Sequence, residues 1–224
     1  MFSNGPTIST NRLVLALDAG DKNSYVSGST TWIDLAGTNN GTLTNGPTFN
    51  TGSGGSIVFD GVDDYVDTVS GSSTVALTSA ATFSSWFKTT TSAAGELARQ
   101  IGTSDNGLEL IILGGKISGA AFIGTWQNFP TSSLSYNDNI WHNAVVTVSG
   151  TQITIYVDSN FIFTTSLGSG TLNTGNGKVR VGLHPNGSSS PFAGNIAITQ
   201  LYNRALSASE VLQNYNATKG RFGL

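Results

Sequence analysis

The sequence predicts an all-β protein: a two-sheet antiparallel sandwich or jelly roll with one short helix near its end. The first observation behind this prediction is a succession of short alternating segments, separated by turn residues, along most of the 224 residues. The second is that only 10% of residues are charged, while glycine, serine, threonine and asparagine, which favour turns and solvated strand faces, are abundant. A parallel α/β sheet would need helical crossovers, and the sequence predicts none before residue 207.

The predicted strands follow one another from residue 13 onward. Residues 1–11 are expected to form an arm and residues 12–224 a single domain, with an irregular region at 20–55. The alternation is clearest at 152–158, where Ile153, Ile155 and Val157 share one face of a strand. The strands are expected at residues 13–17, 57–60, 64–69, 82–88, 108–113, 117–124, 141–148, 152–158, 161–165, 178–184 and 195–202.

One helix is predicted at residues 208–215. Ser207 and Glu210 have the spacing of a capping box, in which each side chain accepts a hydrogen bond from the other residue's backbone. Leu206 and Val211 occupy the two positions of a hydrophobic staple. A helix this short depends on packing against the rest of the protein.

Composition excludes several classes of function. The net charge is −3 and the basic residues are scattered, so nucleic acid is not an expected partner. No apolar run approaches the roughly 20 residues that span a bilayer, so membrane insertion is not expected. The first ten residues lack the features of a secretory signal, so either a signal was removed before this numbering or the chain never used the secretory route. Because residue 1 is Met, we expect the second. The absence of cysteine removes disulfides, thiol catalysis and the common structural zinc sites.

Four segments in a fixed order carry a resemblance to a known family. They are WIDLAGTNNGTLTNGPTF (32–49), IVFDGVDDYV (57–66), WHNAVVTVSGTQITIYVD (141–158) and FAGNIAITQLYNRALSASEVLQNYNATKGRF (192–222). With these segments the chain resembles the laminin-G-like/concanavalin-A-like jelly rolls. The ending NYNATKGR (214–221) is similar to that of stand-alone versions among tailed-phage structural proteins. The resemblance implies two stacked antiparallel sheets, a first strand that pairs near the last one, and a terminal helix on the surface.

The functions that the resemblance implies are carbohydrate binding, protein adhesion and, in phages, attachment or decoration of the virion. We therefore expect a non-enzymatic phage virion structural protein, such as a capsid decoration protein or a fibre or adhesion protein. Its expected location is the virion, and its expected partners are other capsid or tail proteins and host-surface glycans, with a homo-oligomer left open. The alternative is a soluble, extracellular carbohydrate-binding module.

A glycoside hydrolase or polysaccharide lyase is the disfavoured reading. Glycosidases need two carboxylates that face each other across the scissile bond. The chain has three glutamates, Glu96, Glu109 and Glu210, and they are isolated in the sequence. Related lyases use clusters of Arg, Gln, His and Tyr, to which residues 96–100 have only a faint similarity. The sequence therefore predicts no catalytic residues.

The candidate carbohydrate site is centred on Trp126. A sugar site needs an exposed aromatic plane with polar neighbours that orient the hydroxyl groups. Trp126 lies in a polar segment that begins with a glycine, and Gln127, Asn128 and Tyr136 are its candidate partners. The alternative is that this ring packs against the edge of the sandwich. The other three tryptophans occupy positions that the family uses for packing.

The candidate metal site is a structural calcium site, the one cofactor that the sequence leaves open. Calcium takes six to eight oxygen ligands. Asp60 and Asp63 in an acidic turn, with Asp34 and Asn39 from the Asn/Gly-rich loop, are the candidate ligands. The resemblance also places a usually acidic position at Ala197, so this ligand is missing. The alternative is that Asp60 and Asp63 form hydrogen bonds within their turn.

Overall fold

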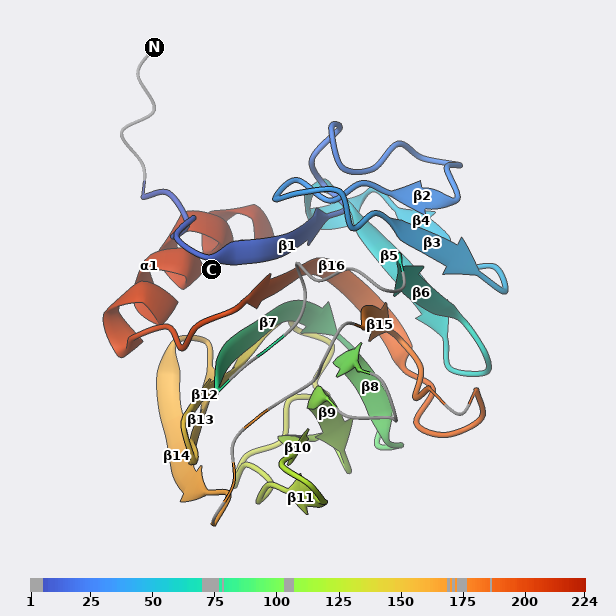
Figure 1. The fold of residues 1–224 in the computed structure, drawn as a ribbon. Coiled ribbons are helices and arrows are strands. Elements are labelled where there is room, and N and C mark those ends of the chain that lie inside the picture. The colour runs from blue at the N-terminus through green and yellow to red at the C-terminus, as the bar shows by residue number, and fades with distance from the viewer. Residues whose placement is uncertain are drawn as a thin grey trace.

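The computed structural model describes residues 6–69, 77, 79–102, 107–168, 170, 172, 177–185 and 187–224. Within these residues the strands form two antiparallel sheets of eight strands each, packed face to face (Figure 1). One short α-helix follows the last strand. The predicted fold class, an all-β two-sheet sandwich with a C-terminal helix, is confirmed.

Sheet A contains the central strands of the molecule. In spatial order it consists of β14 (Asn160–Ser166), β13 (Gln152–Val157), β12 (His142–Ser149), β7 (Ala80–Lys88), β16 (Ala193–Tyr202), β5 (Ser56–Asp60) and β4 (Thr48–Asn50). The eighth strand, β1 (Leu13–Asp18), pairs with β16. The first strand therefore lies beside the last one, as the family resemblance implied.

Sheet B packs against the opposite side of the core. In spatial order it consists of β11 (Trp126–Asn128), β10 (Lys116–Phe122), β9 (Leu108–Leu113), β8 (Gly95–Ile101), β15 (Lys178–Val181), β6 (Tyr65–Thr68), β3 (Gly41–Thr44) and β2 (Thr31–Trp32). Of the sixteen strands in the described part of the chain, five were not predicted from the sequence: β2, β3, β4, β8 and β11.

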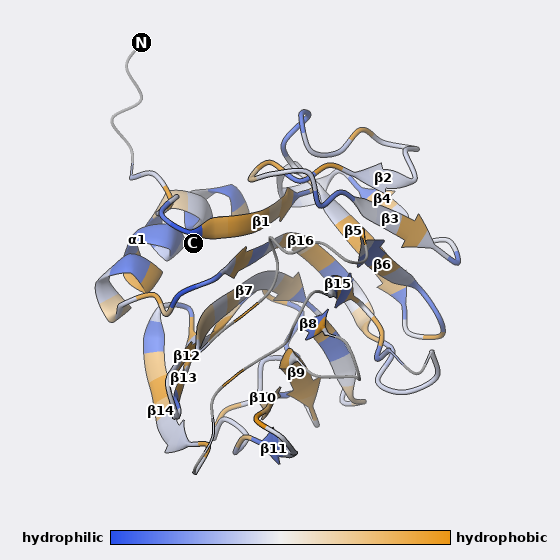
Figure 2. Ribbon diagram, in the orientation of Figure 1, coloured by the Kyte–Doolittle hydropathy of each residue, from blue (hydrophilic) through white to orange (hydrophobic). Residues whose placement is uncertain are grey.

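The core lies between the sheets because apolar residues alternate along the strands. In β13, Ile153, Ile155 and Val157 are buried, whereas Gln152 is exposed. Figure 2 shows the apolar residues of β1, β7 and β9. Burial of one large apolar side chain contributes roughly 1.5–3 kcal/mol, so the core dominates the stability of the fold. Its largest buried side chains include Trp32, Phe59, Phe83, Phe87 and Phe192.

The helix α1 (Ala208–Thr218) covers part of the outer face of sheet A. The capping box is present, since Ser207 accepts a hydrogen bond from the Glu210 backbone and Glu210 accepts one from the Ser207 backbone. Helix α1 continues into a 3-10 turn, η4 (Lys219–Phe222). There Phe222 stacks on the outward-facing Trp86 of β7, with 4.2 Å between ring centroids. The helix is three residues longer than predicted because this packing stabilises its last turn.

Three tryptophans predicted to pack are buried. Trp32 lies in the main core, and Trp86 and Trp141 lie beneath the C-terminal segment. Among the residues that the structure describes, no helix has the length and apolar character needed to cross a membrane.

Candidate functional site

A row of polar side chains crosses the outer face of sheet B. The residues face outward because their neighbours along each strand, such as Val66, Val179, Val181, Leu108 and Leu110, belong to the core. In the strand register each member of the row lies directly opposite the next. From β6 to β11 the row consists of Asp67, Arg180, Arg99, Glu109, Ala120 and Asn128.

The charged members of the row form ion pairs. Arg180 binds both carboxylate oxygens of Asp67, with Nε–Oδ1 and Nη2–Oδ2 distances of 2.7 Å each. The hydrogen bonds that Arg180 donates to Asp67 raise the pKa of Arg180, so the guanidinium stays charged. Lys178 also donates to Asp67, at 2.5 Å. On the other side of the row, Arg99 Nη1 lies 3.1 Å from Glu109 Oε2. These pairs fix the arginine side chains in one geometry.

Two aromatic rings flank the row. The Arg99 guanidinium lies over the Trp126 ring and the Arg180 guanidinium lies over the Tyr65 ring, both at 4.1 Å from the ring centroid. Both rings remain partly exposed, while Arg99 is only 3% and Arg180 only 7% exposed. The outer face of sheet B therefore presents partly exposed aromatic rings over fixed, charged donors, an arrangement in which each cation–π contact adds roughly 0.5–2 kcal/mol.

A cavity of about 210 Å³ opens at the Trp126 end of the row. Its walls are one aromatic ring, one amide, one imidazole, one carboxylate and one guanidinium, together with a small alanine. The lining residues are Arg99, Glu109, Ala120, Trp126, Asn128 and His184. A few converging polar groups beside an aromatic surface are typical of a small-ligand site.

A larger cavity of about 410 Å³ lies between Tyr25, Leu43 and Phe49. No charged side chain lines it, and Tyr25 uses its hydroxyl to donate to the Ser29 carbonyl. Because it lacks converging charged groups, we favour the smaller cavity on sheet B as the functional site.

The structure brings together two of the four residues predicted for the carbohydrate site. Trp126 and Asn128 line the sheet B cavity. Gln127 lies between them on β11 and donates to Thr125 Oγ1, so its amide is directed elsewhere. Tyr136 is buried, and its ring contacts His142 at 5.0 Å between centroids.

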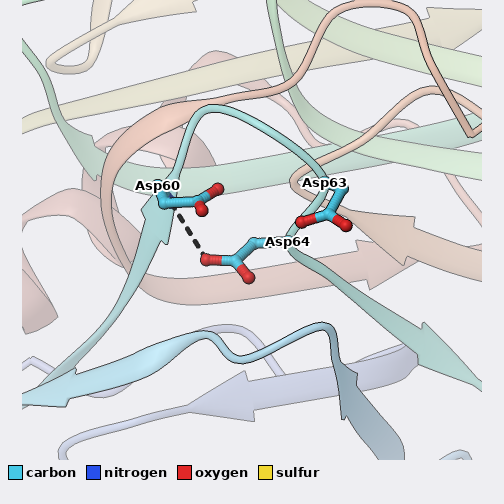
Figure 3. A group of neighbouring side chains, drawn as sticks. All are labelled: Asp60, Asp63 and Asp64. Carbon is cyan, nitrogen blue, oxygen red and sulfur yellow. Dashed lines mark hydrogen bonds between the residues drawn. The ribbon is translucent and has the colours of Figure 1, made fainter.

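The structure separates the four residues predicted for calcium into two groups. Asp60, Asp63 and Asp64 surround one turn, with carboxylate oxygens within 4.8 Å of one another (Figure 3). Asp60 accepts from the Val62 backbone, and Asp64 accepts from the Asp60 backbone. Burial, together with the charges of Asp60 and Asp63, raises the pKa of Asp64. Each of these carboxylates can offer one or two of the six to eight oxygens that calcium takes, and the calcium site at this turn stays a prediction.

Asp34 and Asn39 lie elsewhere, along the outer edge of β1. The Asp34 carboxylate accepts hydrogen bonds from the backbone of Ala16, at 2.9 Å, and of Asn39, at 3.1 Å. Asn39 donates to the Val14 carbonyl. Both side chains thus hold the irregular loop against the first strand, and Asp34 does not join the acidic turn.

The carbohydrate site predicted from the sequence did not include Arg99, Glu109, Arg180, Asp67 or Tyr65. The alternation at 178–181 and 64–69 indicated which of these residues share a strand face. Which strands are neighbours was not visible, because Asp67 and Arg180 lie 113 residues apart.

A laminin-G family model, described as "Concanavalin A-like lectin/glucanases superfamily", matches residues 60–212 of the chain. No curated protein sequence matches the chain.

Solved structures with a similar fold include domain 4 of AbnA, an extracellular GH43 arabinanase from Geobacillus stearothermophilus, in complex with arabinotriose. It is 16% identical, with a TM-score of 0.72, over 91% of this chain and 98% of that domain. The binding domain of Paraclostridial Mosquitocidal Protein 1 is 17% identical, with a TM-score of 0.71, over 93% of this chain. The botulinum neurotoxin serotype G binding domain is 16% identical, with a TM-score of 0.68, over 91% of this chain.

The chain spans about half the length of the two toxin binding domains, 52% and 50% respectively. At these identities the structural similarity shows a shared fold. The family model covers more than half of the chain. The protein therefore belongs to the concanavalin A-like lectin/glucanase superfamily.

Proposed function

We propose that this protein is a non-catalytic carbohydrate-binding domain and that its sugar site is the outer face of sheet B at Trp126. The observation that carries the proposal is the cavity in which a partly exposed indole lies beside Arg99, Glu109, Asn128 and His184. The indole offers an apolar plane to the C–H face of a sugar ring, and the polar groups offer donors and acceptors to its hydroxyls.

The proposed ligand is a neutral glycan. Within the row, Asp67 binds Arg180 and Glu109 binds Arg99, so both guanidinium groups are already paired with a carboxylate, and Lys178 beside the row also binds Asp67. An acidic sugar would have to compete with Glu109 for the guanidinium of Arg99. A hydroxyl group can instead bond to the amide of Asn128, which lines the same cavity and offers both a donor and an acceptor, without breaking the pair.

The similar structures support binding in preference to catalysis. One is a domain of a glycosidase seen with an oligosaccharide, and two are binding domains of toxins. Glu109, one of the three glutamates of the chain, forms an ion pair with Arg99. We expect the glycans that bind to remain intact after prolonged incubation with the protein.

Glycan-array screening followed by calorimetry tests the proposal. Trp126→Ala is expected to weaken the best glycan about thirtyfold or more, since truncation of an aromatic anchor costs roughly 2 kcal/mol. Ile140→Ala removes an exposed apolar side chain from the loop before β12 and is the matched control, with unchanged affinity expected. If no glycan binds, or if Trp126→Ala binds as well as the parent protein, the proposal is wrong.

The role in a phage particle remains a prediction from the family resemblance. A virion protein that binds host-surface glycans would have both this role and the glycan site proposed on sheet B. Mass spectrometry of purified particles tests this role, and absence of the chain from them would contradict it.

A further inference from the structure

A cavity of about 470 Å³ opens beside the turn between β13 and β14, at the margin of sheet A (Figure 1). It shares no lining residue with the two cavities described above and is larger than both. The loop before β12 supplies one wall and the β13–β14 hairpin supplies the other. The lining residues are Ser133, Leu134, Tyr136, Val157, Asp158, Asn160, Phe161 and Ile162. A cavity of this volume holds a small organic molecule.

Asp158 places a carboxylate in this cavity and is held there from behind. Its Oδ2 lies 2.7 Å from His142 Nδ1, and its Oδ1 accepts from the Asn143 backbone N–H at 2.8 Å. Asp158 and Ser159 form the turn with φ values of 52° and 64°, a left-handed conformation that side chains other than glycine disfavour. The two hydrogen bonds fix the carboxylate despite this strain. A carboxylate offers about four acceptor positions, so the 22% of the Asp158 side chain that is exposed can accept from a ligand.

The charge around Asp158 favours a cation. His142 lies between the carboxylates of Asp158 and Asp138 and carries at most one positive charge, so these three groups keep a net negative charge. The Asn160 side-chain nitrogen donates to the Asp158 carbonyl, which leaves its oxygen as an acceptor. Among the described residues, no lysine, arginine or histidine lines the cavity. The cavity therefore presents acceptors and negative charge to whatever enters it.

Aromatic and aliphatic side chains surround the carboxylate. Phe161 is 62% exposed, and Tyr136 lines the same cavity. Burial, followed by the charge of Asp158, raises the pKa of Tyr136, so this ring lies within electrostatic reach of the carboxylate. Aromatic faces attract ammonium ions within about 6 Å of the ring centroid. The exposed Leu134 adds apolar surface for alkyl groups. A bare metal ion would instead need a cage of oxygen ligands, and the lining contains one carboxylate.

We propose that this cavity binds a small alkylated ammonium ion, with the cation beside Asp158 and its alkyl groups against Phe161 and Tyr136. The carboxylate supplies the charge attraction, and the rings supply contacts that an alkylated nitrogen can make and a hydrated metal ion cannot. The cavity is separate from the glycan site on sheet B, and the proposal does not depend on that site.

Calorimetric titration of the full chain with choline chloride tests the site, with sodium chloride at equal concentration as the salt control. The comparison ligand is the neutral alcohol in which a tert-butyl group replaces the trimethylammonium group of choline. The two ligands have the same shape and differ in charge. Choline is expected to bind, and the alcohol is expected to bind about tenfold more weakly, because it lacks the attraction to the carboxylate and the rings.

Two matched variants test the aromatic contact. Phe161→Leu keeps an exposed apolar side chain but removes the ring, and is expected to weaken choline binding about threefold or more. Phe49→Leu makes the same change in the cavity between Tyr25 and Leu43, which no carboxylate lines, and is expected to leave choline binding unchanged. Asp158→Asn is expected to abolish binding, and the exposed position of Phe161 keeps the test valid if that variant fails to fold.

Vesicles of phosphatidylcholine distinguish two sources of the ammonium group. Cosedimentation that choline reverses would assign a lipid headgroup, and choline binding without cosedimentation would assign a free ammonium ion; either result supports recognition of the alkylated nitrogen. Absence of choline binding, equal affinity for the neutral alcohol, or a Phe161→Leu variant that binds choline as tightly as the parent protein would overturn the proposal.

Discussion

At the scale of single residues, His142 is a buried titratable group outside the proposed glycan site. Its Nδ1 lies 2.7 Å from Asp158 Oδ2 and its Nε2 lies 3.1 Å from Asp138 Oδ1. Both ring nitrogens can donate only when the imidazole is protonated. Phe87 and Tyr136 pack against the ring and exclude water. The protonated histidine thus links the loop before β12 to the turn between β13 and β14.

This arrangement predicts a pH-dependent contribution to stability. Burial lowers the pKa of His142, but the bonds and charges of Asp158 and Asp138 outweigh it and raise the pKa above 6.5. A raised pKa in the folded state stabilises the protein below the unfolded value, and this stabilisation is lost as the pH rises through the folded pKa. His142→Gln should therefore destabilise the protein more at about pH 6 than at about pH 9.

Urea unfolding of both proteins at the two pH values measures this difference. The pKa of Asp138 is lowered, because the hydrogen bonds from Ile140 and His142 and the charge of His142 outweigh burial. Its contribution is lost only as the pH falls below its ordinary value of 3.8, outside the chosen window. An equal loss of stability at both pH values would contradict the assigned role of His142.

At the scale of elements, hydrogen bonds at the start of α1 connect the segment before β1 to the C-terminal part of the chain. Arg204 binds both carboxylate oxygens of Glu210, and the same guanidinium donates to Ser9 Oγ and the Asn11 carbonyl. Asn214 accepts from the Ser9 backbone. The segment before β1, predicted as part of an arm, is thus held against the helix from Thr7 onward.

Glu210 gives the second pH-dependent prediction. The bonds from Arg204, followed by the Ser207 backbone, lower the pKa of Glu210 to about 2. A lowered pKa stabilises the folded protein above the unfolded value of 4.5, and this contribution is lost as the pH falls toward about 2. Glu210→Gln should be less stable than the parent protein at neutral pH, and thermal unfolding should show the difference shrinking below about pH 4. A difference that persists to about pH 2 would contradict the ion-pair account.

The elements that the sequence predicted are those with a clean local pattern. The capping box and the alternation of β13 depend on neighbours within a few residues. Strand β8 was missed because Glu96, Arg99 and Gln100 are buried in it, and because the register shifts between Glu96 and Ala98. Buried polar residues and a bulge break the period of two on which strand prediction depends.

At the scale of the whole molecule, low charge should make glycan binding insensitive to salt. The net charge is −3, and the charges of the sheet B row are paired with one another. Salt screens attraction between unpaired charges and has little effect on stacking or on hydroxyl hydrogen bonds. The dissociation constant should therefore change less than roughly twofold between about 0.05 and 0.5 M NaCl. A steep loss of affinity in calorimetry would indicate an acidic ligand instead.

The sequence by itself determined the fold class, the helix and its cap, and the family resemblance, because all of these depend on short-range patterns. It also identified Trp126 and Asn128 as candidates. Only the tertiary structure decided that Asp67, Arg180, Arg99 and Glu109 lie in one row, and that Asp34 covers the edge of β1. The physical reason is that register between strands far apart in the chain is set by how both sheets close over the core.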